Sequence, residues 1–314
     1  MTLGLRGDYA INFAQILTQS RITHYVLRAM TQQSPVPRVL AIHDLSGFGR
    51  AALTVVIPIL STMGIQVCPL PTAVFSTHGM FLGYRSLDLT DYLRDCLQHW
   101  RELNLRFDAI YSGFLNSARQ LDLITSFLRD IPHQDRFVVI DPVLGDNGRL
   151  YGVTPPDLVA AMRAYIRLAD VITPNLTEAA LLLDEPYQTD MAEEAIKEWL
   201  IRLAEAGPDT VIITSVPVVD LPSHAAVLAY NRIEGICWRV LCERIPATFP
   251  GTGDAFTSII VGSLLQGHSL PVAVDRAVQF ISLAIRTAVE FASPEREGIL
   301  LEGVLDILKL SPIQ

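Results

Sequence analysis

The 314-residue chain is poor in lysine, which excludes one common kind of phosphate site. Lysine occurs only at positions 197 and 309, and neither follows a glycine, so the loop G-x-x-x-x-G-K-[ST] is absent. The residues "AIK" at 195–197 resemble a protein-kinase strand, but they lie within "MAEEAIKEWLIRLAEAG", which has the periodicity of an amphipathic helix. Schiff-base chemistry has almost no candidate nucleophile in this chain.

Cysteine and histidine are also scarce, and neither forms a metal-binding pattern. The four cysteines make no C-x-x-C pair, and the seven histidines show neither H-x-H nor H-E-x-x-H, so we expect no structural zinc site. We find no signal peptide and no run of about 18 apolar residues. We therefore expect a reduced, cytoplasmic protein with no membrane segment.

The charge balance narrows the class of ligand. The net charge is −9, half of the residues are hydrophobic and 18% are charged. This composition favours a large core and argues against binding to nucleic acid or to anionic membranes. It is compatible with a small phosphorylated ligand, because a few oriented backbone amides and one cation suffice to hold a phosphate.

Two regions differ in pattern. Residues 1–29 have loose helical periodicity and are followed by the polar, proline-bearing "TQQSPVPR". We expect residues 1–37 to be an N-terminal extension and linker, and a chain that begins at Met30 to fold. Residues 38–314 have the pattern of one domain.

In this second region, apolar runs alternate with amphipathic segments. The apolar runs predict strands at 38–43, 65–71, 108–113, 136–142, 170–175 and 209–215. The segments between them predict helices at 52–64, 91–103, 118–131, 155–169, 176–183 and 191–206. Residues 225–231 and 236–244 alternate like an antiparallel hairpin, and three helices close the chain at about 253–267, 271–291 and 302–309. The alternation predicts an α/β fold whose mostly parallel sheet is covered on both faces and carries a small antiparallel addition.

Acidic side chains follow several of the predicted strands. Together with the start of the helix at 253, these loops supply at least five carboxylates: Asp44, Asp141, Asp146, Glu178 and Asp254. Ligands of open α/β sheets bind beyond the carboxyl ends of the strands. Packing so many like charges together is costly unless a cation or a proton transfer compensates them. An oxygen-ligated cation such as Mg²⁺, shared with substrate phosphates, fits this composition.

One of these loops also matches a dinucleotide-binding pattern. The residues "GFGRAA" at 47–52 fit G-x-G-x-x-A after a predicted strand. NAD binding also needs an acidic residue at the end of the second strand to hold the ribose, and here that strand ends in "VCPLP". We therefore do not expect an NAD site.

The stretch "FPGTGDAF" at 249–256 allows two interpretations. Asp254 can be an N-cap that starts a helix. Alternatively, Gly251 and Gly253 let a phosphate reach the free amides at the helix start, and Asp254 receives the proton of an acceptor hydroxyl. The second interpretation describes phosphoryl transfer, which also requires a cation on the phosphates.

The GTGD motif resembles the anion hole of the ribokinase-like superfamily and, more narrowly, of its vitamin-kinase branch, with pyridoxal/pyridoxamine kinase most similar. Further segments follow the family's order and spacing from Val39 to about Leu308: "LAIHDLSGFGRAALTVVIPILSTMGIQVCPLPTAVFSTHG", "SGFLNS", "DPVLGDNGRLY", "ADVITPNLTEAALL" and "GPDTVIITS". The resemblance implies a ribokinase-like three-layer α/β/α domain over residues 38–314. It also implies a homodimeric, ATP-dependent kinase of vitamin B6 salvage that phosphorylates the 5′-hydroxymethyl group of pyridoxal, pyridoxamine or pyridoxine.

The resemblance assigns roles to individual residues. Asp254 becomes the catalytic base beside the substrate, and the amides around Gly251, Thr252 and Gly253 become the anion hole. Asp141 and Thr173 correspond to ligands of a monovalent cation, K⁺ or Na⁺. Further positions correspond to contacts with ATP and its Mg²⁺: Asp146, Asn175, Glu178, Thr214, Ser215 and Thr252. Tyr151 corresponds to a tyrosine over the ATP site, or it packs without touching a ligand.

Departures from the family pattern fall at three substrate-binding positions. Asp44 stands where many pyridoxal kinases have serine, Gly79 where threonine is usual, and Phe114 where tyrosine is frequent. Asp44 can hold a protonated ring nitrogen or a cationic aminomethyl group, which would favour pyridoxamine, or it can cap the next helix. Two other functions stay open: a hydroxymethylpyrimidine kinase of thiamine synthesis, and a vitamer-binding protein without catalysis.

Overall fold

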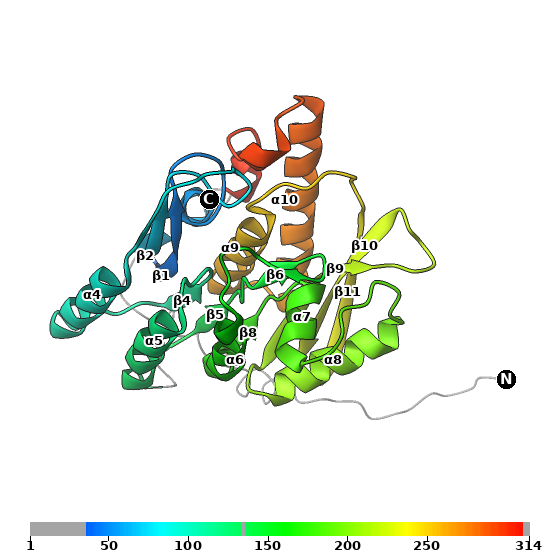
Figure 1. Ribbon diagram of the computed structural model, residues 1–314. Coiled ribbons are helices and arrows are strands. Elements are labelled where there is room, and N and C mark those ends of the chain that lie inside the picture. The colour runs from blue at the N-terminus through cyan, green and yellow to red at the C-terminus, as the bar shows by residue number, and fades with distance from the viewer. Residues whose placement is uncertain (1–35, 133–135, 310–314) are drawn as a thin grey trace, which may run out of the picture.

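The computed structural model describes residues 36–132 and 136–309, and its centre is a nine-stranded sheet (Figure 1). The strands are β1 (Arg38–Ser46), β2 (Gln66–Phe75), β3 (Ser86–Asp88), β4 (Ala109–Ser112), β5 (Val138–Ile140), β8 (Val171–Ile172), β9 (Thr210–Pro217), β10 (His224–Asn231) and β11 (Ile236–Glu243). Their spatial order is β11-β10-β9-β8-β5-β4-β1-β2-β3. The neighbours from β9 to β2 pair in parallel, whereas β10 and β11 are antiparallel at one edge and β3 at the other. The predicted fold class is confirmed, and β3 is an addition that the pattern did not indicate.

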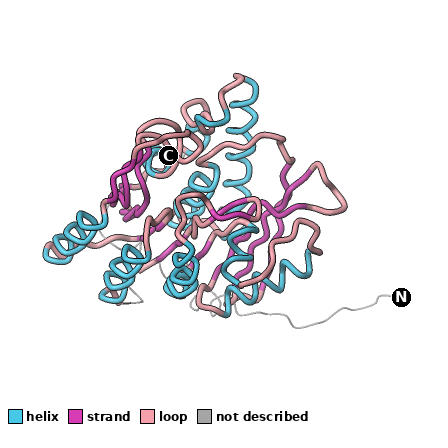
Figure 2. Tube along the Cα trace, in the orientation of Figure 1, coloured by secondary structure: helices cyan, strands magenta, loops and turns pink. Residues whose placement is uncertain are grey.

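Helices cover both faces of this sheet (Figures 1 and 2). One face carries α3 (Leu53–Thr62), α9 (Thr252–Leu265) and α10 (Leu270–Glu290). The other carries α4 (Thr90–Glu102), α5 (Ala118–Asp130), α6 (Pro156–Tyr165), α7 (Leu176–Leu183) and α8 (Glu193–Glu205). Each predicted helix from 52 to 291 is present within a few residues. The predicted helix at 302–309 is wrong, because that region forms only the single 3-10 turn η4 (Leu305–Leu308).

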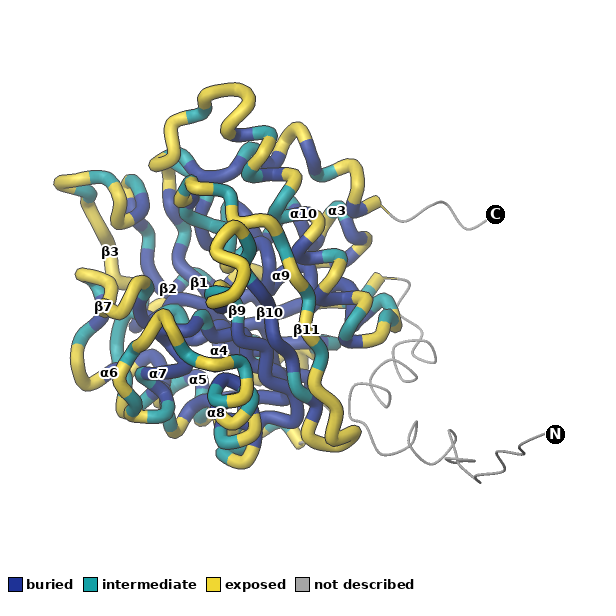
Figure 3. The backbone as a smooth tube through the Cα atoms, turned by 90° about the vertical axis from the view of Figure 1, so that its right-hand side faces the viewer, coloured by how far each residue is buried: buried dark blue, intermediate teal, exposed yellow. Residues whose placement is uncertain are grey.

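Strand β1 shows how the two hydrophobic cores form. Val39 and Ala41 face the core under α3, α9 and α10, whereas Leu40 and Ile42 face the core under α4 to α8. All four side chains are fully buried, as is most of the sheet's centre (Figure 3). A strand buried on both faces reads as one continuous apolar run, which is the pattern of "VLAI".

Two of the expectations from the sequence can be compared with the described residues, and a third cannot. All four cysteines are free, as expected for a reduced protein. In the described ranges we find no helix with the length and apolarity needed to cross a bilayer. The expected helix and linker of residues 1–37 fall almost wholly outside those ranges, so the independence of the chain from its first 29 residues stays a prediction.

Candidate active site

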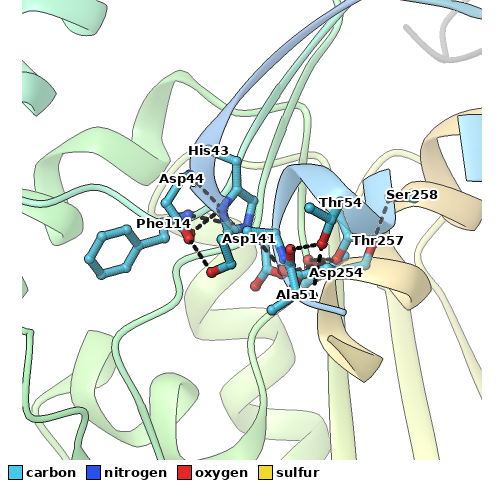
Figure 4. Close-up of polar contacts among 12 residues, drawn as sticks. His43, Asp44, Ala51, Thr54, Phe114, Asp141, Asp254, Thr257 and Ser258 are labelled. Atoms are coloured by element: carbon cyan, nitrogen blue, oxygen red, sulfur yellow. Dashed lines mark hydrogen bonds and ion pairs between the residues drawn. The ribbon is translucent and has the colours of Figure 1, made fainter. Parts of the chain in front are cut away.

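The candidate site lies where β1, β4 and β5 end and α9 begins (Figure 4). Three of the five predicted carboxylates, Asp44, Asp141 and Asp254, are grouped there around the imidazole of His43. Their side chains are largely or wholly withdrawn from solvent. His43 and Asp254, which are in contact, lie 211 positions apart in the sequence.

Asp254 lies in the first turn of α9, and its carboxylate points away from its own helix. Asp254 Oδ1 lies 2.9 Å from His43 Nε2, and Oδ2 accepts a 2.6 Å hydrogen bond from the backbone N–H of Ala52. The N-cap of α9 is Gly251. The interpretation of Asp254 as an N-cap is therefore wrong, and the carboxylate is aimed at the other acidic loops.

The glycines before Asp254 shape the turn at the start of α9. Gly251 has φ of 82°, and a Cβ there would overlap the carbonyl oxygen of Arg50, so a side chain is excluded on both counts. Gly253 is exposed, and the nearest heavy atom to a Cβ built on it is Asp141 Oδ2 at 3.8 Å. The first amides of a helix have no intrahelical partner, so those of residues 252–254 are available to an anion.

The electrostatic pairing of Asp254 with His43 determines the charge of both groups. Burial alone would lower the pKa of His43, but the charge and hydrogen bond of Asp254, followed by those of Asp44, raise it from 6.5 to about 10. Burial alone would raise the pKa of Asp254, but the charge and hydrogen bond of His43 and the Ala52 N–H lower it below its ordinary value. Asp254 is therefore ionised at neutral pH, as a base must be.

The pKa of Asp141 is shifted in the opposite direction to that of Asp254. It follows β5, and burial, together with the negative charge of Asp254, raises its pKa to about 7. Thr257 Oγ1 donates to Asp141 Oδ2 at 3.4 Å and lies 2.8 Å from Thr173 Oγ1. Asp141 and Thr173, the two residues that the resemblance assigns to a monovalent cation, thus share Thr257 as a neighbour.

Glu178 and Asn175 form a capping box at the start of α7. Asn175 Oδ1 accepts from the Glu178 N–H at 3.0 Å, and Glu178 Oε2 accepts from the Asn175 N–H at 2.9 Å. Glu178 Oε1 accepts from the Leu144 N–H at 2.9 Å, and Asn175 Nδ2 donates to the Gly145 carbonyl at 2.8 Å. Both residues therefore attach the loop after β5 to α7.

The other nucleotide positions lie around this loop. Asp146 is half-buried in a two-residue strand, β6 (Gly145–Asp146), which pairs with β7 (Arg149–Leu150). Tyr151 lies directly after β7 and is 40% exposed. Thr214 and Ser215 end the parallel part of β9, and Ser215 is exposed with φ of 57°. Across residues 36–132 and 136–309, no three His, Cys, Asp or Glu side chains form a ready-made metal cluster.

The three predicted substrate positions differ in their surroundings. Asp44 lies within β1 and contacts His43 Nδ1 at 2.9 Å and Ser46 Oγ at 3.2 Å, while α3 begins after Ala52. The interpretation of Asp44 as a helix cap is therefore wrong. Phe114 is buried against Phe75 at a ring distance of 5.9 Å. Gly79 is exposed, and a Cβ built on it has open space around it.

Three contributors to the site were not predicted: the His43 ring, the Ala52 N–H and the Thr257 hydroxyl. The sequence contains a signal for His43, because it continues the alternation of Val39 and Ala41 and so faces the same core as α9. Thr257 lies three residues after Asp254 on the same helix, which places both on one side. No residue type near position 52 indicates that the Ala52 N–H donates to Asp254.

Comparison with known proteins identifies the family. A family model described as "Phosphomethylpyrimidine kinase" matches residues 90–297. Human pyridoxal kinase is 30% identical over 288 residues, which cover 83% of this chain and 89% of that protein. The chain belongs to the pyridoxal kinase family. Members of this family are kinases, and the protein is accordingly a phosphotransferase with an alcohol group as acceptor.

Solved structures support the same family and its fold. The crystal structure of pyridoxal kinase from Lactobacillus plantarum is 31% identical, with a TM-score of 0.78 over 88% of this chain and 97% of that one. A Bacteroides thetaiotaomicron protein, described provisionally as a phosphomethylpyrimidine kinase and crystallised with pyridoxal, is 54% identical. Its TM-score is 0.85 over 89% of this chain and 97% of that one. The predicted resemblance to pyridoxal kinases and the ribokinase-like fold are confirmed.

Proposed function

We propose that this pyridoxal kinase family member transfers the γ-phosphoryl group of ATP to the 5′-hydroxymethyl group of a B6 vitamer. The proposal rests on the position and charge of the Asp254 carboxylate. It is ionised, it contacts His43 and the Ala52 N–H, and it lies at the amide-rich start of α9. A carboxylate there accepts the hydroxyl proton as the oxygen bonds to phosphorus, while the amides of residues 252–254 stabilise charge on the transferred group. The relative crystallised with pyridoxal supports this class of acceptor.

The residues around Asp141 fit the cations that such a reaction uses. Asp141 and Thr173 offer only oxygen atoms, and Asp141 is a buried carboxylate beside a second negative charge, Asp254. A hard cation would relieve that repulsion. We assign Asp141 and Thr173 to a monovalent cation, and Asp146 and Glu178 to Mg²⁺ with the nucleotide. Bound Mg²⁺ supplies positive charge to the phosphates, and Asn175, Thr214, Ser215, Thr252 and Tyr151 would contact the nucleotide.

The 5′-hydroxyl acceptor would lie beside Asp254, with the pyridine ring toward Asp44, Gly79 and Phe114. Cytoplasmic location and a homodimer complete the proposal. The free cysteines support the first, and the family resemblance supports the second. Light scattering of the purified chain tests the dimer, for which a monomeric mass is the contrary result.

Phosphorylation of a hydroxymethylpyrimidine is the second candidate, because the matched family model carries that description. Measuring ADP release with pyridoxal, pyridoxamine, pyridoxine and hydroxymethylpyrimidine separates the two substrates. We expect kcat/KM to be highest for one of the three vitamers. A preference for the pyrimidine would reject the proposal, and tight vitamer binding without ADP release would favour a binding protein.

Replacing the base tests the mechanism. We expect Asp254→Asn to lower kcat about 1000-fold or more while ATP still binds, because the amide cannot accept the hydroxyl proton. The same change at exposed Asp122 on α5 is the matched control and should leave kcat unchanged. Near-normal turnover by Asp254→Asn would refute the role of this carboxylate as the base.

A further inference from the structure

The imidazole of His43 lies in a buried space bounded by residues of β1 and β4. In the pairing of β1 with β4, Ala41 lies beside Tyr111 and Ile42 beside Ser112, so Gly113 falls next to His43. A Cβ at Gly113 would overlap the imidazole ring. The ring of Tyr111 meets His43 edge-on at 6.3 Å, and only 3% of the His43 side chain is exposed. The absence of a side chain at Gly113 is thus what admits the imidazole.

Both ring nitrogens of His43 face carboxylate oxygens. Nδ1 lies 2.9 Å from Asp44 Oδ1, and Nε2 lies 2.9 Å from Asp254 Oδ1. The backbone N–H groups of Asp44 and Phe114 also approach Nδ1 and Nε2, at 2.9 and 3.4 Å respectively. An unprotonated nitrogen would direct a lone pair at a carboxylate, whereas a protonated one makes a charge-assisted hydrogen bond. Two such bonds outweigh the backbone contacts, so a proton on each nitrogen fits this environment.

We propose that His43 is a positioning residue: its imidazolium bridges Asp44 and Asp254, fixing the orientation of the base carboxylate and keeping it ionised for the transfer. The kinetic part of this inference rests on the proposed function. The arrangement also links the base to Asp44, the residue placed toward the vitamer ring. His43 itself need not touch either substrate.

Among the charged and titratable groups around His43, the carboxylates favour the imidazolium. Asp44 lies on its own strand, Asp254 on α9, Tyr111 on β4 and Asp141 after β5, while His78 comes from the loop after β2. The carboxylates facing His43 raise its pKa to about 10. Loss of the imidazolium would remove the main positive charge that lowers the pKa of Asp254. The base would then become protonated at a higher pH.

Two substitutions separate the effect of the His43 hydrogen bond on the position of Asp254 from the effect of the His43 charge. In His43→Gln the side-chain amide extends about as far as Nε2 and can still donate to Asp254, whereas in His43→Asn it extends only about as far as Nδ1. We expect kcat with pyridoxal to fall about tenfold in the His43→Gln variant and at least about 100-fold in the His43→Asn variant. In both variants the acid limb of the pH profile of kcat/KM should move to higher pH by about one unit, because both lose the charge.

Two further variants distinguish positioning from a loss of stability. Gly113→Ala leaves the imidazole intact but displaces it, and it should reproduce the loss of kcat. Ile42→Val is a buried change one position before His43, on the opposite face of β1, and should lower thermal stability without moving the acid limb. Losses of kcat in the His43 variants that follow thermal stability, with an unmoved acid limb, would overturn the inference.

A measurement without substrate separates this inference from the proposed function. In the ¹⁵N spectrum of the uniformly labelled full chain, the His43 signals are those lost in His43→Gln. We expect both ring nitrogens to be protonated at pH 8, and a neutral ring there would overturn the inference. If the wild-type chain turns over none of the three vitamers, the proposed function fails, but this spectrum still decides whether His43 is a cation between two carboxylates.

Discussion

Asp44 connects the predicted vitamer contacts to the base through His43. Its Oδ1 contacts Nδ1 of His43, and its Oδ2 accepts a hydrogen bond from the Ser46 hydroxyl. We expect Asp44→Ser to shift preference from pyridoxamine toward pyridoxal by about tenfold, because serine cannot offer a charge-assisted acceptor to the aminomethyl group. The measurement is the ratio of kcat/KM for the two vitamers. A general loss through His43 affects both vitamers equally and cancels in this ratio, so an unchanged ratio would reject Asp44 as the specificity residue.

Ala52 combines a strained backbone with a functional hydrogen bond. Its φ of 55° and ψ of −134° lie outside the regions that alanine prefers, and its N–H donates to Asp254. Strain of this kind costs about 1–3 kcal/mol, whereas glycine costs about 0.5–1 kcal/mol in backbone entropy. We therefore expect Ala52→Gly to leave the free energy of unfolding unchanged or to raise it by about 1 kcal/mol, measured by urea denaturation.

The neighbouring alanine supplies the control. Ala51 is also buried but has no positive φ, so Ala51→Gly should lower the free energy of unfolding by up to about 1 kcal/mol through the added backbone entropy of the unfolded chain. Equal losses in both variants would mean that Ala52 stores no strain.

Individual site residues were predictable where a chemically functional residue type stood at a position where sites form, such as the end of a strand. Asp44, Asp141 and Asp254 each follow a glycine-flanked or strand-end pattern, and the structure brings all three together. His43 was missed because a single histidine in an apolar run resembles a core residue. Its role depends on which strand lies next to β1 and on the glycine at that register, and neither is written in the local sequence.

Helix α7 and the loop after β5 form one hydrogen-bonded unit through Glu178. Both of its carboxylate oxygens accept backbone N–H groups, from Leu144 and from Asn175. In Glu178→Gln one of these N–H groups would face an NH₂ group, so we expect the free energy of unfolding to fall by about 1–3 kcal/mol. Urea denaturation measures it, and Glu194→Gln in the exposed first turn of α8 should change it by less than about 0.5 kcal/mol. Equal effects would show that the two N–H bonds add no stability.

The sequence pattern predicted the long elements and the short buried strands β5 and β8, but it missed three other short strands. Helix α7 begins and ends at the predicted residues, and it is bounded by a capping box at its start and by the left-handed C-cap residue Asp184 at its end. Strands β6 and β7 have two residues each, and β3 has three, and none of them lies in an apolar run that would indicate a strand. The 302–309 segment has apolar spacing, but four residues of 3-10 helix form no α-helix.

Across the whole molecule, the site depends on contacts between distant segments. The partners His43 and Asp254 are 211 positions apart, and the sheet order that joins them places β1 between β2 and β4. Strand alternation predicts that a parallel sheet exists but does not give the order of its strands. The family resemblance supplied the fold and the site residues but no strand order, and for this reason the approximate place of the site was predictable although the bridge between its acids was not.

The same bridge predicts how stability of the whole molecule varies with pH. In the folded state the pKa of His43 is about 10, above its ordinary 6.5, so the folded chain holds a proton that the unfolded chain releases between these values. The stabilisation from His43 is therefore complete below about pH 6.5 and is lost as pH rises through about 10, by an amount on the order of a few kcal/mol.

The prediction is tested by urea denaturation of the wild type and of His43→Gln between pH 6.5 and 10. The difference in free energy of unfolding between the two should shrink steadily as pH rises, because only the wild type has the proton to lose. His99→Gln, an exposed change on α4, should keep the wild-type pH dependence. If the wild-type and His43→Gln curves run parallel over this range, His43 is not charged in the folded protein, and the ionised state of Asp254 must then be maintained without that charge, by hydrogen bonds such as that from the Ala52 N–H.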